Sequence, residues 1–348
     1  MTAAVAIVGG GLTGLALARY LHDAGVPFRL FEARSRLGGR IKTEHLGADG
    51  FDLGPSWFWP GQPRMAALIR DLGLEVFEQY AAGALLYETE QGEVIRDRGF
   101  SSMQGSLRVR GGMGAIASGL GDGLPDMSVE TARTLVSVSD DGTLGFADGR
   151  TVAADKIVLA MPPRIVRQVT FAPALTPEVD TALAAIPTWM AGHAKFVAVY
   201  DQPFWRADGL SGDAMSRRGP MVEIHDASTD TKGALFGFLG VPAALRRGQS
   251  AAVMQACVSQ LELLFGPKAG SPVEVFYTDW AEDPYTAAAL DQDPLTHHPA
   301  YGLPAALKAP MGARVYVAST ELALEMGGFL EGALAAAEDA AHWVLATS

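Results

Sequence analysis

The sequence predicts an α/β fold of two domains, the first of them a Rossmann-like dinucleotide-binding domain with a β-meander. Three observations support this prediction. An apolar run at 3–8 leads into a glycine-rich turn and then into a helical pattern, which is how a βαβ unit begins. A set of short strands with turn signals occupies 127–163. The length of 348 residues suits two domains.

The first strand and the turn after it predict a phosphate site. The strand, "AAVAIV", is apolar throughout, as expected where both faces of a parallel sheet are covered. Gly9, Gly11 and Gly14 follow with the G-x-G-x-x-G spacing, which permits a tight turn, close approach of a pyrophosphate and close helix packing. Leu12 and Thr13 open the helix, whose unpaired N–H groups and partial positive charge favour phosphate.

The second strand, "PFRLFEA", ends on the acidic residue that a dinucleotide site requires. Glu32 stands roughly twenty residues beyond the glycines and can accept hydrogen bonds from ribose hydroxyls. Ala33 and Arg34 follow it directly. Strand, helix and acidic residue together predict a dinucleotide site, and the alternative is a glycine-rich loop kept only for packing.

A second loop of glycine and arginine indicates which dinucleotide is bound. "EARSRLGGR" at 32–40 is followed by "DLG" at 52–54. This combination resembles the flavin-containing amine oxidase family, which includes the monoamine and polyamine oxidases and binds FAD with such a loop. The extra glycines let the backbone lie beside a flat ring, and Arg36 and Arg40 offer cationic donors to phosphate and flavin oxygens.

The resemblance extends along nearly the whole chain and implies a discontinuous organisation. The FAD-binding domain is expected to comprise 1–77, 108–170 and 290–348. A smaller substrate-binding domain, built on a mixed or antiparallel sheet, is expected to comprise 78–107 and 171–289.

The resemblance also implies a non-covalent FAD site. The expected FAD-binding residues are Gly9, Gly11, Leu12, Thr13, Gly14, Glu32, Ala33, Arg34, Gly39, Arg40, Gly54, Pro55, Ser56, Leu135, Thr320, Glu321, Gly328 and Phe329. The helix after Gly328 is expected to aim its N-terminus at the flavin and to stabilise the negative charge gained on reduction, unless it is an ordinary helix start. Ala289 stands near the place of the cysteine that some members bond covalently to the flavin.

Three residues are expected to shape the reaction. Lys195 lies in the otherwise apolar strand "KFVAVY", where burial of an ammonium without a partner is costly. Either the side chain snorkels to the end of the strand, or, as the resemblance implies, it reaches flavin N5 through a water and assists the reaction with oxygen. Phe329 matches one wall of the family's aromatic cage. The other wall falls at Leu290, so it is lost or supplied by another residue.

The stretch "GPSWFWP" places three aromatic side chains in a row between two prolines. The family's chain passes the flavin here, which implies that Trp57 and Trp59 line the substrate side while Phe58 turns into the core. The alternative is that all three pack the domain junction.

The resemblance implies an FAD-dependent oxidoreductase, most simply an amine oxidase. Hydride would pass from an amine, or from another apolar C–H donor, to flavin N5, and O2 would then yield hydrogen peroxide. One alternative keeps FAD in a desaturase, an isomerase or a renalase-like NAD(P)H oxidase. A second alternative is a non-catalytic flavin-binding protein.

Composition excludes several other classes. The net charge of −12 argues against nucleic acid as a partner. The sequence contains no apolar run of about 18 residues, so we expect no membrane span. Cys257 is the only cysteine, the first residues lack a signal-peptide pattern, and the seven histidines show no metal spacing. We therefore expect a cytoplasmic enzyme without a metal.

Overall fold

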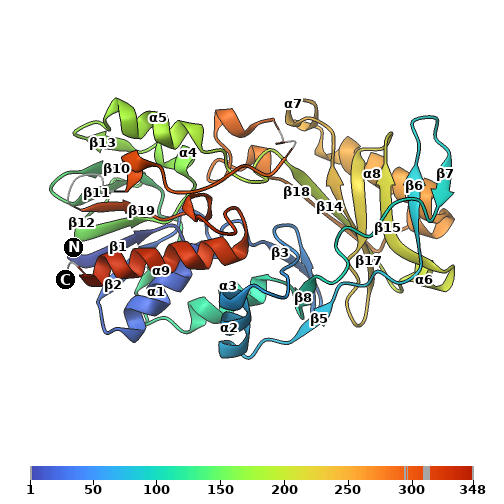
Figure 1. The fold of residues 1–348 in the computed structure, drawn as a ribbon, viewed down its shortest axis with the longest axis horizontal. Helices are drawn as coiled ribbons and strands as arrows, with labels where there is room; N and C mark the ends of the chain where they lie inside the picture. The colour runs from blue at the N-terminus through green and yellow to red at the C-terminus, as the bar shows by residue number, and fades with distance from the viewer. Residues whose placement is uncertain (1, 294, 296, 309–313, 347–348) are drawn as a thin grey trace.

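A computed structural model describes residues 2–293, 295, 297–308 and 314–346, and two β-sheets form its framework (Figure 1). The first sheet runs in the order β13-β10-β11-β12-β1-β2-β9, and β19 also pairs with β12. Its strands are β1 (Thr2–Val8), β2 (Phe28–Phe31), β9 (Val129–Glu130), β10 (Leu135–Ser139), β11 (Thr143–Phe146), β12 (Thr151–Leu159), β13 (Thr170–Ala172) and β19 (Val315–Val317).

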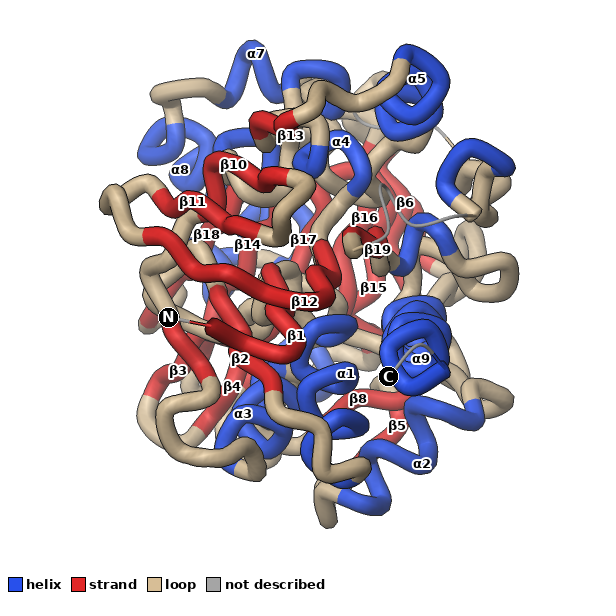
Figure 2. Tube along the Cα trace, turned by 90° about the vertical axis from the view of Figure 1, so that its left-hand side faces the viewer, coloured by secondary structure: helices blue, strands red, loops and turns tan. Residues whose placement is uncertain are grey.

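The pairing in this sheet confirms the predicted fold class. β1 is parallel to β2 and β12, and β19 is parallel to β12, as in a Rossmann-like core. β10, β11 and β12 are antiparallel neighbours and form the meander. Figure 2 shows these strands lying side by side.

Helices cover both faces of the first sheet, which explains why its first strand is apolar throughout. Val5 and Ile7 pack into one core with the helices of one face, while Ala6 and Val8 pack into a second core with the meander. The first core contains α1 (Leu12–Asp23), α2 (Pro63–Asp71), α3 (Gly114–Asp122) and α9 (Leu330–Ala346). The second contains α4 (Pro163–Val166) and α5 (Pro177–Ala185).

The second sheet is mixed, as predicted. Its order is β18-β14-β17-β16-β15-β6-β7, mostly antiparallel, with β6 parallel to β15. The strands are β6 (Ala84–Glu88), β7 (Val94–Arg96), β14 (Ala194–Tyr200), β15 (Leu210–Ser216), β16 (Met221–Asp226), β17 (Gly233–Leu239) and β18 (Glu274–Asp279). One face packs on α8 (Ser250–Phe265), and the other meets Phe51 and Leu53 from the first half of the chain.

The remaining elements are short. They are β3 (Thr43–Leu46), β4 (Asp49–Asp52), β5 (Val76–Glu78), β8 (Leu107–Val109), α6 (Phe204–Ala207), α7 (Ala243–Arg246) and the 3₁₀ turns η1 (Pro267–Gly270), η2 (Trp280–Glu282), η3 (Ala289–Asp291), η4 (Ala305–Leu307) and η5 (Thr320–Leu322). The division of the chain into domains at the positions given above stays a prediction. In the described part of the chain, no helix is both long enough and apolar enough to cross a membrane.

Candidate active site

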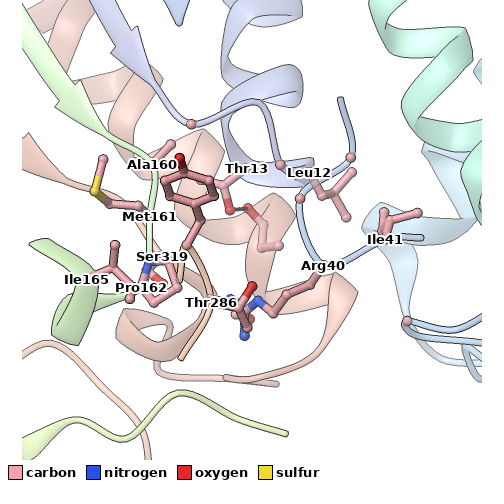
Figure 3. A pocket seen from close by; sticks show the side chains of 18 of the residues that line it. Leu12, Thr13, Arg40, Ile41, Ala160, Met161, Pro162, Ile165, Thr286 and Ser319 are labelled. Carbon is pink, nitrogen blue, oxygen red and sulfur yellow. Dashed lines mark hydrogen bonds between the residues drawn. The ribbon is translucent and has the colours of Figure 1, made fainter. Parts of the chain in front are cut away.

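A cavity of about 640 Å³ is lined by residues of both sheets. Figure 3 shows three distant parts of the chain around it. These are Leu12 and Thr13 at the start of α1, Arg40 and Ile41 of the second loop, and residues 160–162 after β12. The cavity therefore follows the carboxyl ends of β1 and β12, where open parallel sheets bind ligands.

Most of the predicted site residues line this cavity. They are Gly9, Gly11, Leu12, Thr13, Glu32, Ala33, Arg34, Gly39, Arg40, Gly54, Pro55, Ser56, Trp57, Leu135, Lys195, Thr320, Gly328 and Phe329. Two predicted residues, Gly14 and Glu321, are not among the residues that line it. A Cβ at Gly14 would lie 1.9 Å from the carbonyl oxygen of Gly9, so this glycine lets α1 pack against the turn. Glu321 lies behind the cavity wall and binds the guanidinium of Arg40, which does line it.

The first glycine turn is held in place by Glu32. Gly9 adopts φ +112°, and a Cβ there would lie 2.3 Å from the carbonyl oxygen of Ala160. The Glu32 carboxylate is 2% exposed; it accepts hydrogen bonds from the backbone N–H of Gly10 at 2.7 Å and of Arg34 at 2.8 Å. Because each carboxylate oxygen can accept more than one hydrogen bond, Glu32 can both fix the turn and meet a ribose hydroxyl.

The prediction that Arg36 faces the cofactor is wrong. Its guanidinium donates to the backbone carbonyls of Leu37, Gly39 and Ile41 at 2.8 to 3.1 Å, so it braces the second loop from inside. Gly39 adopts φ +57°, and a Cβ there would lie 3.0 Å from Gly11 Cα. The two glycine loops therefore lie against each other, and Arg40, unlike Arg36, is among the residues that line the cavity.

Arg40 lines the cavity and is held there by a buried carboxylate, Glu321. The fully buried Glu321 accepts hydrogen bonds from the Arg40 guanidinium at 2.5 and 3.1 Å, and from the hydroxyl of Ser319. Burial alone would raise the pKa of Glu321, but Arg40 and Ser319 hold it below its usual range. A carboxylate and a cation thus stay ionised at the start of the η5 turn.

Lys195 lies on β14, 5% exposed, with its ammonium at the cavity. It donates a hydrogen bond to the carbonyl oxygen of Gly54 and lies 4.8 Å from the ring centres of Phe236 and Phe238. Burial lowers the pKa of Lys195 to about 7, although the charge of Asp52 partly opposes this. The side chain does not reach a strand end in water, which argues against snorkelling.

His193 is a cavity residue that the sequence reasoning missed. It stands two residues before Lys195, a spacing that places side chains on the same face of a strand, and this was the available signal. Burial and the neighbouring charges of Lys195 and Arg246 lower the pKa of His193 to about 4. The imidazole is therefore neutral at physiological pH.

The three aromatic residues of "WFW" point in different directions. Phe58 is 4% exposed and packs in the core of the first sheet. Trp57 and Trp59 both line the cavity. The Trp57 ring also packs edge-on against Phe236 at 5.4 Å, and its indole N–H donates to Gln79 at 2.7 Å. Trp57 thus lines the cavity and packs the junction at the same time.

Two aromatic rings lie next to Phe329, and Leu290, the expected place of the second cage wall, is not part of the cavity lining. Phe329 stacks on His298 at 5.1 Å and meets Trp59 edge-on at 6.1 Å. Leu290 is 60% exposed and is not among the residues that line the cavity. Further aromatic lining residues, which sequence reasoning did not single out, are Trp189, Phe238, Trp280 and Tyr285.

Comparison with known proteins agrees with this geometry. The sequence model of the family described as "Flavin containing amine oxidoreductase" matches residues 12–94 and 77–345. The chain belongs to this family. Family membership confirms the predicted FAD cofactor and the predicted FAD-dependent oxidoreductase.

Individual members of the amine oxidoreductase family resemble the chain over almost its full length. The probable flavin-containing monoamine oxidase A of Dictyostelium discoideum is 23% identical, over 95% of this chain and 94% of that protein. The putrescine oxidase of Kocuria rosea is 24% identical, over 96% and 94%. Putrescine oxidase bound to putrescine has TM-score 0.83 with 22% identity, and cyclohexylamine oxidase from Brevibacterium oxydans has TM-score 0.82 with 20% identity; each covers 99% of both chains.

The residues present fit the family's FAD. Two glycines of the lining bring the backbone close to the cavity for different reasons: a Cβ at Gly54 would lie 2.0 Å from the carbonyl oxygen of Arg40, whereas a Cβ at Gly11 would meet nothing closer than 3.9 Å and would fill space beside the turn. The α1 start at Leu12 and the α9 start at Leu330 both open on the cavity, so two helix N-termini can meet negative charge there. Cys257 is buried on α8 and is not among the residues that line the cavity. That the flavin is held non-covalently stays a prediction.

Proposed function

We propose that the chain oxidises a small amine with an apolar body and uses O2 as the acceptor. The bound FAD supplies the acceptor for a hydride from the substrate carbon, and the chain supplies the walls. The observation that carries the proposal is the cavity lining around Lys195, which includes Trp57, Trp59, Phe238 and Phe329. A wall of aromatic rings favours an apolar substrate body.

The same surroundings select the neutral form of the amine. The burial that lowers the pKa of Lys195 to about 7 and that of His193 to about 4 penalises every cation in this part of the cavity. We therefore expect the amine to enter as the free base, after its proton has passed to bulk water. The neutral amine carries the lone pair that assists departure of the hydride, so desolvation also favours the chemistry.

In this proposal each site residue has a separate role. Trp57 and Phe329 are walls that orient the amine, and Lys195 is the cation that assists the reaction with O2. The expected FAD-binding residues keep the roles given to them by resemblance. A reducing compartment such as the cytoplasm fits a chain whose single thiol, Cys257, is buried.

A matched pair of substrates tests this proposal. Among the described residues that line the cavity, Glu32 is the only carboxylate, and it is hydrogen-bonded to the first glycine turn. A second ammonium near Lys195 would have no partner of opposite charge. We expect kcat/KM for butylamine to exceed that for 1,4-diaminobutane by about 100-fold, because an unpaired buried charge is costly.

The readout is hydrogen peroxide released by the purified protein with each amine. Equal or faster oxidation of the diamine would contradict the apolar-body assignment. Absence of peroxide with every amine of a series from butylamine to benzylamine would contradict the oxidase assignment itself.

A further inference from the structure

The segment that follows η2 contributes part of the cavity wall. Tyr285 and Thr286 line the cavity, as do Arg34 and Thr134. Figure 3 shows Thr286 among the lining side chains, beside residues from the first and second glycine loops. Segments that are far apart in the sequence therefore meet at one part of the cofactor site.

Side-chain contacts fasten this segment across the cavity wall. The Arg34 guanidinium donates to both carboxylate oxygens of Asp283, at 2.6 and 3.2 Å, and to the hydroxyl of Thr286 at 3.0 Å. The hydroxyl groups of Tyr285 and Thr134 lie 3.0 Å apart. The guanidinium carbon of Arg34 also lies 5.2 Å from the centre of the Tyr285 ring.

Internal hydrogen bonds make residues 283–287 a compact turn. The carbonyl oxygen of Asp283 accepts from the N–H groups of Thr286 at 3.1 Å and Ala287 at 2.9 Å. The Asp283 side chain accepts from the N–H of Tyr285 at 2.9 Å. The turn is therefore held in one conformation by its own hydrogen bonds.

Both ends of this turn are anchored to other elements. Before it, the indole N–H of Trp280 donates to the carbonyl oxygen of Leu53 at 2.8 Å. After it, Asp291 accepts from the Arg164 guanidinium at 2.6 Å and from the N–H of Thr188 at 3.0 Å. Between these anchors, the contacts of Asp283, Tyr285 and Thr286 fasten the turn to the cofactor site. The Arg34 and Asp283 side chains are 14% and 22% exposed, so this fastening lies next to solvent.

We propose that residues 283–287 form a latch on the cofactor site, which opens when the Arg34–Asp283 and Thr134–Tyr285 contacts break and lets FAD enter or leave. The contacts join protein groups to each other. Breaking them therefore removes a barrier that FAD must cross in both directions. The latch thus sets how long FAD stays bound, and it does so separately from the choice of substrate.

Three variants isolate the two contacts. Asp283→Asn removes the ion pair but keeps an oxygen for the N–H of Tyr285. Tyr285→Phe keeps the ring beside Arg34 and removes the hydroxyl, and Thr134→Val removes the other hydroxyl of the same contact. Asp180→Asn is the control, because it breaks a bidentate surface pair between Asp180 on α5 and Arg167, which follows α4.

The experiment measures two rates. The rise in flavin fluorescence follows FAD release from the diluted yellow protein, and the fall in flavin fluorescence follows FAD binding to the apoprotein. We expect Asp283→Asn to accelerate both rates about tenfold and Tyr285→Phe about threefold, while Asp180→Asn leaves them unchanged. Thr134→Val should match Tyr285→Phe, and the double variant should add nothing further.

Two outcomes would overturn the latch. Faster release with unchanged binding would show that these residues are simple contacts to FAD. Unchanged rates in all three variants would show that FAD passes elsewhere. An unfolded Asp283→Asn protein would leave the decision to Tyr285→Phe and Thr134→Val, whose losses are one hydroxyl each.

Discussion

Replacing Lys195 with methionine is expected to slow reoxidation of the reduced enzyme by O2 about 100-fold, while reduction by the amine changes little. The ammonium at the cavity is positioned by the carbonyl oxygen of Gly54 and by two phenylalanine rings. A preorganised charge in a dry site stabilises developing negative charge far better than water does, typically by about 3 kcal/mol. Methionine keeps the length and the packing of the side chain and removes that charge. Stopped-flow mixing of the anaerobically reduced protein with O2 measures the effect.

The pH dependence of the reoxidation rate tests whether the positive charge of Lys195 is what accelerates the reaction with O2. Because burial lowers the pKa of Lys195 to about 7, the side chain is an ammonium below pH 7 and neutral above it. The rate of reoxidation should therefore be highest at low pH and fall as pH rises through about 7. The Lys195→Met protein should show no such step, and Lys195→Arg should keep the fast rate at higher pH. An identical pH profile in wild type and Lys195→Met would contradict this role.

Replacing Glu321 with alanine is expected to destabilise the fold by about 3–5 kcal/mol. The carboxylate is fully buried and accepts two hydrogen bonds from Arg40, so its loss leaves a largely buried guanidinium without its partner. The hydroxyl of Ser319 loses its acceptor at the same time. Urea unfolding of the apoprotein, followed by tryptophan fluorescence, measures the free energy of unfolding.

Asp180→Ala is the matched control for Glu321→Ala. Asp180 on α5 also accepts two hydrogen bonds from an arginine, Arg167, but that pair lies on the surface. Exposed pairs contribute little to stability, so this variant should unfold close to wild type. Equal destabilisation by the two variants would contradict the assignment of Arg40–Glu321 as a buried pair that holds the site together.

Local backbone rules made the first half of the site predictable. Gly9 and Gly14 cannot carry a Cβ in the observed turn, so the glycine spacing follows from the geometry itself. Phe58 forms an isolated β-bridge and turns into the core, while its neighbours Trp57 and Trp59 line the cavity, the directions that the family resemblance implied for this short stretch. For the glycines, the information lies within a few residues of the position concerned.

The partners of individual side chains, both nearby and distant, were not predictable from one sequence. Arg36 looked like a cofactor ligand, yet three nearby carbonyls use its donors. Arg34 contacts Asp283, which is 249 residues away, and no spacing rule links such positions. The aromatic rings next to Phe329 come from separate segments. The resemblance could therefore indicate that Leu290 does not supply the second cage wall, but not which side chains lie next to Phe329.

Anaerobic titration of the purified protein tests the central claim most directly. We expect a yellow protein that releases unmodified FAD on denaturation, because Cys257, the single cysteine, is not among the residues that line the cavity. Benzylamine should bleach the oxidised flavin spectrum, NADH and NADPH should leave it unchanged, and air should restore the colour with release of hydrogen peroxide. A yellow protein that nicotinamides bleach and amines do not would contradict amine oxidation, and a protein that binds no FAD would contradict the site itself.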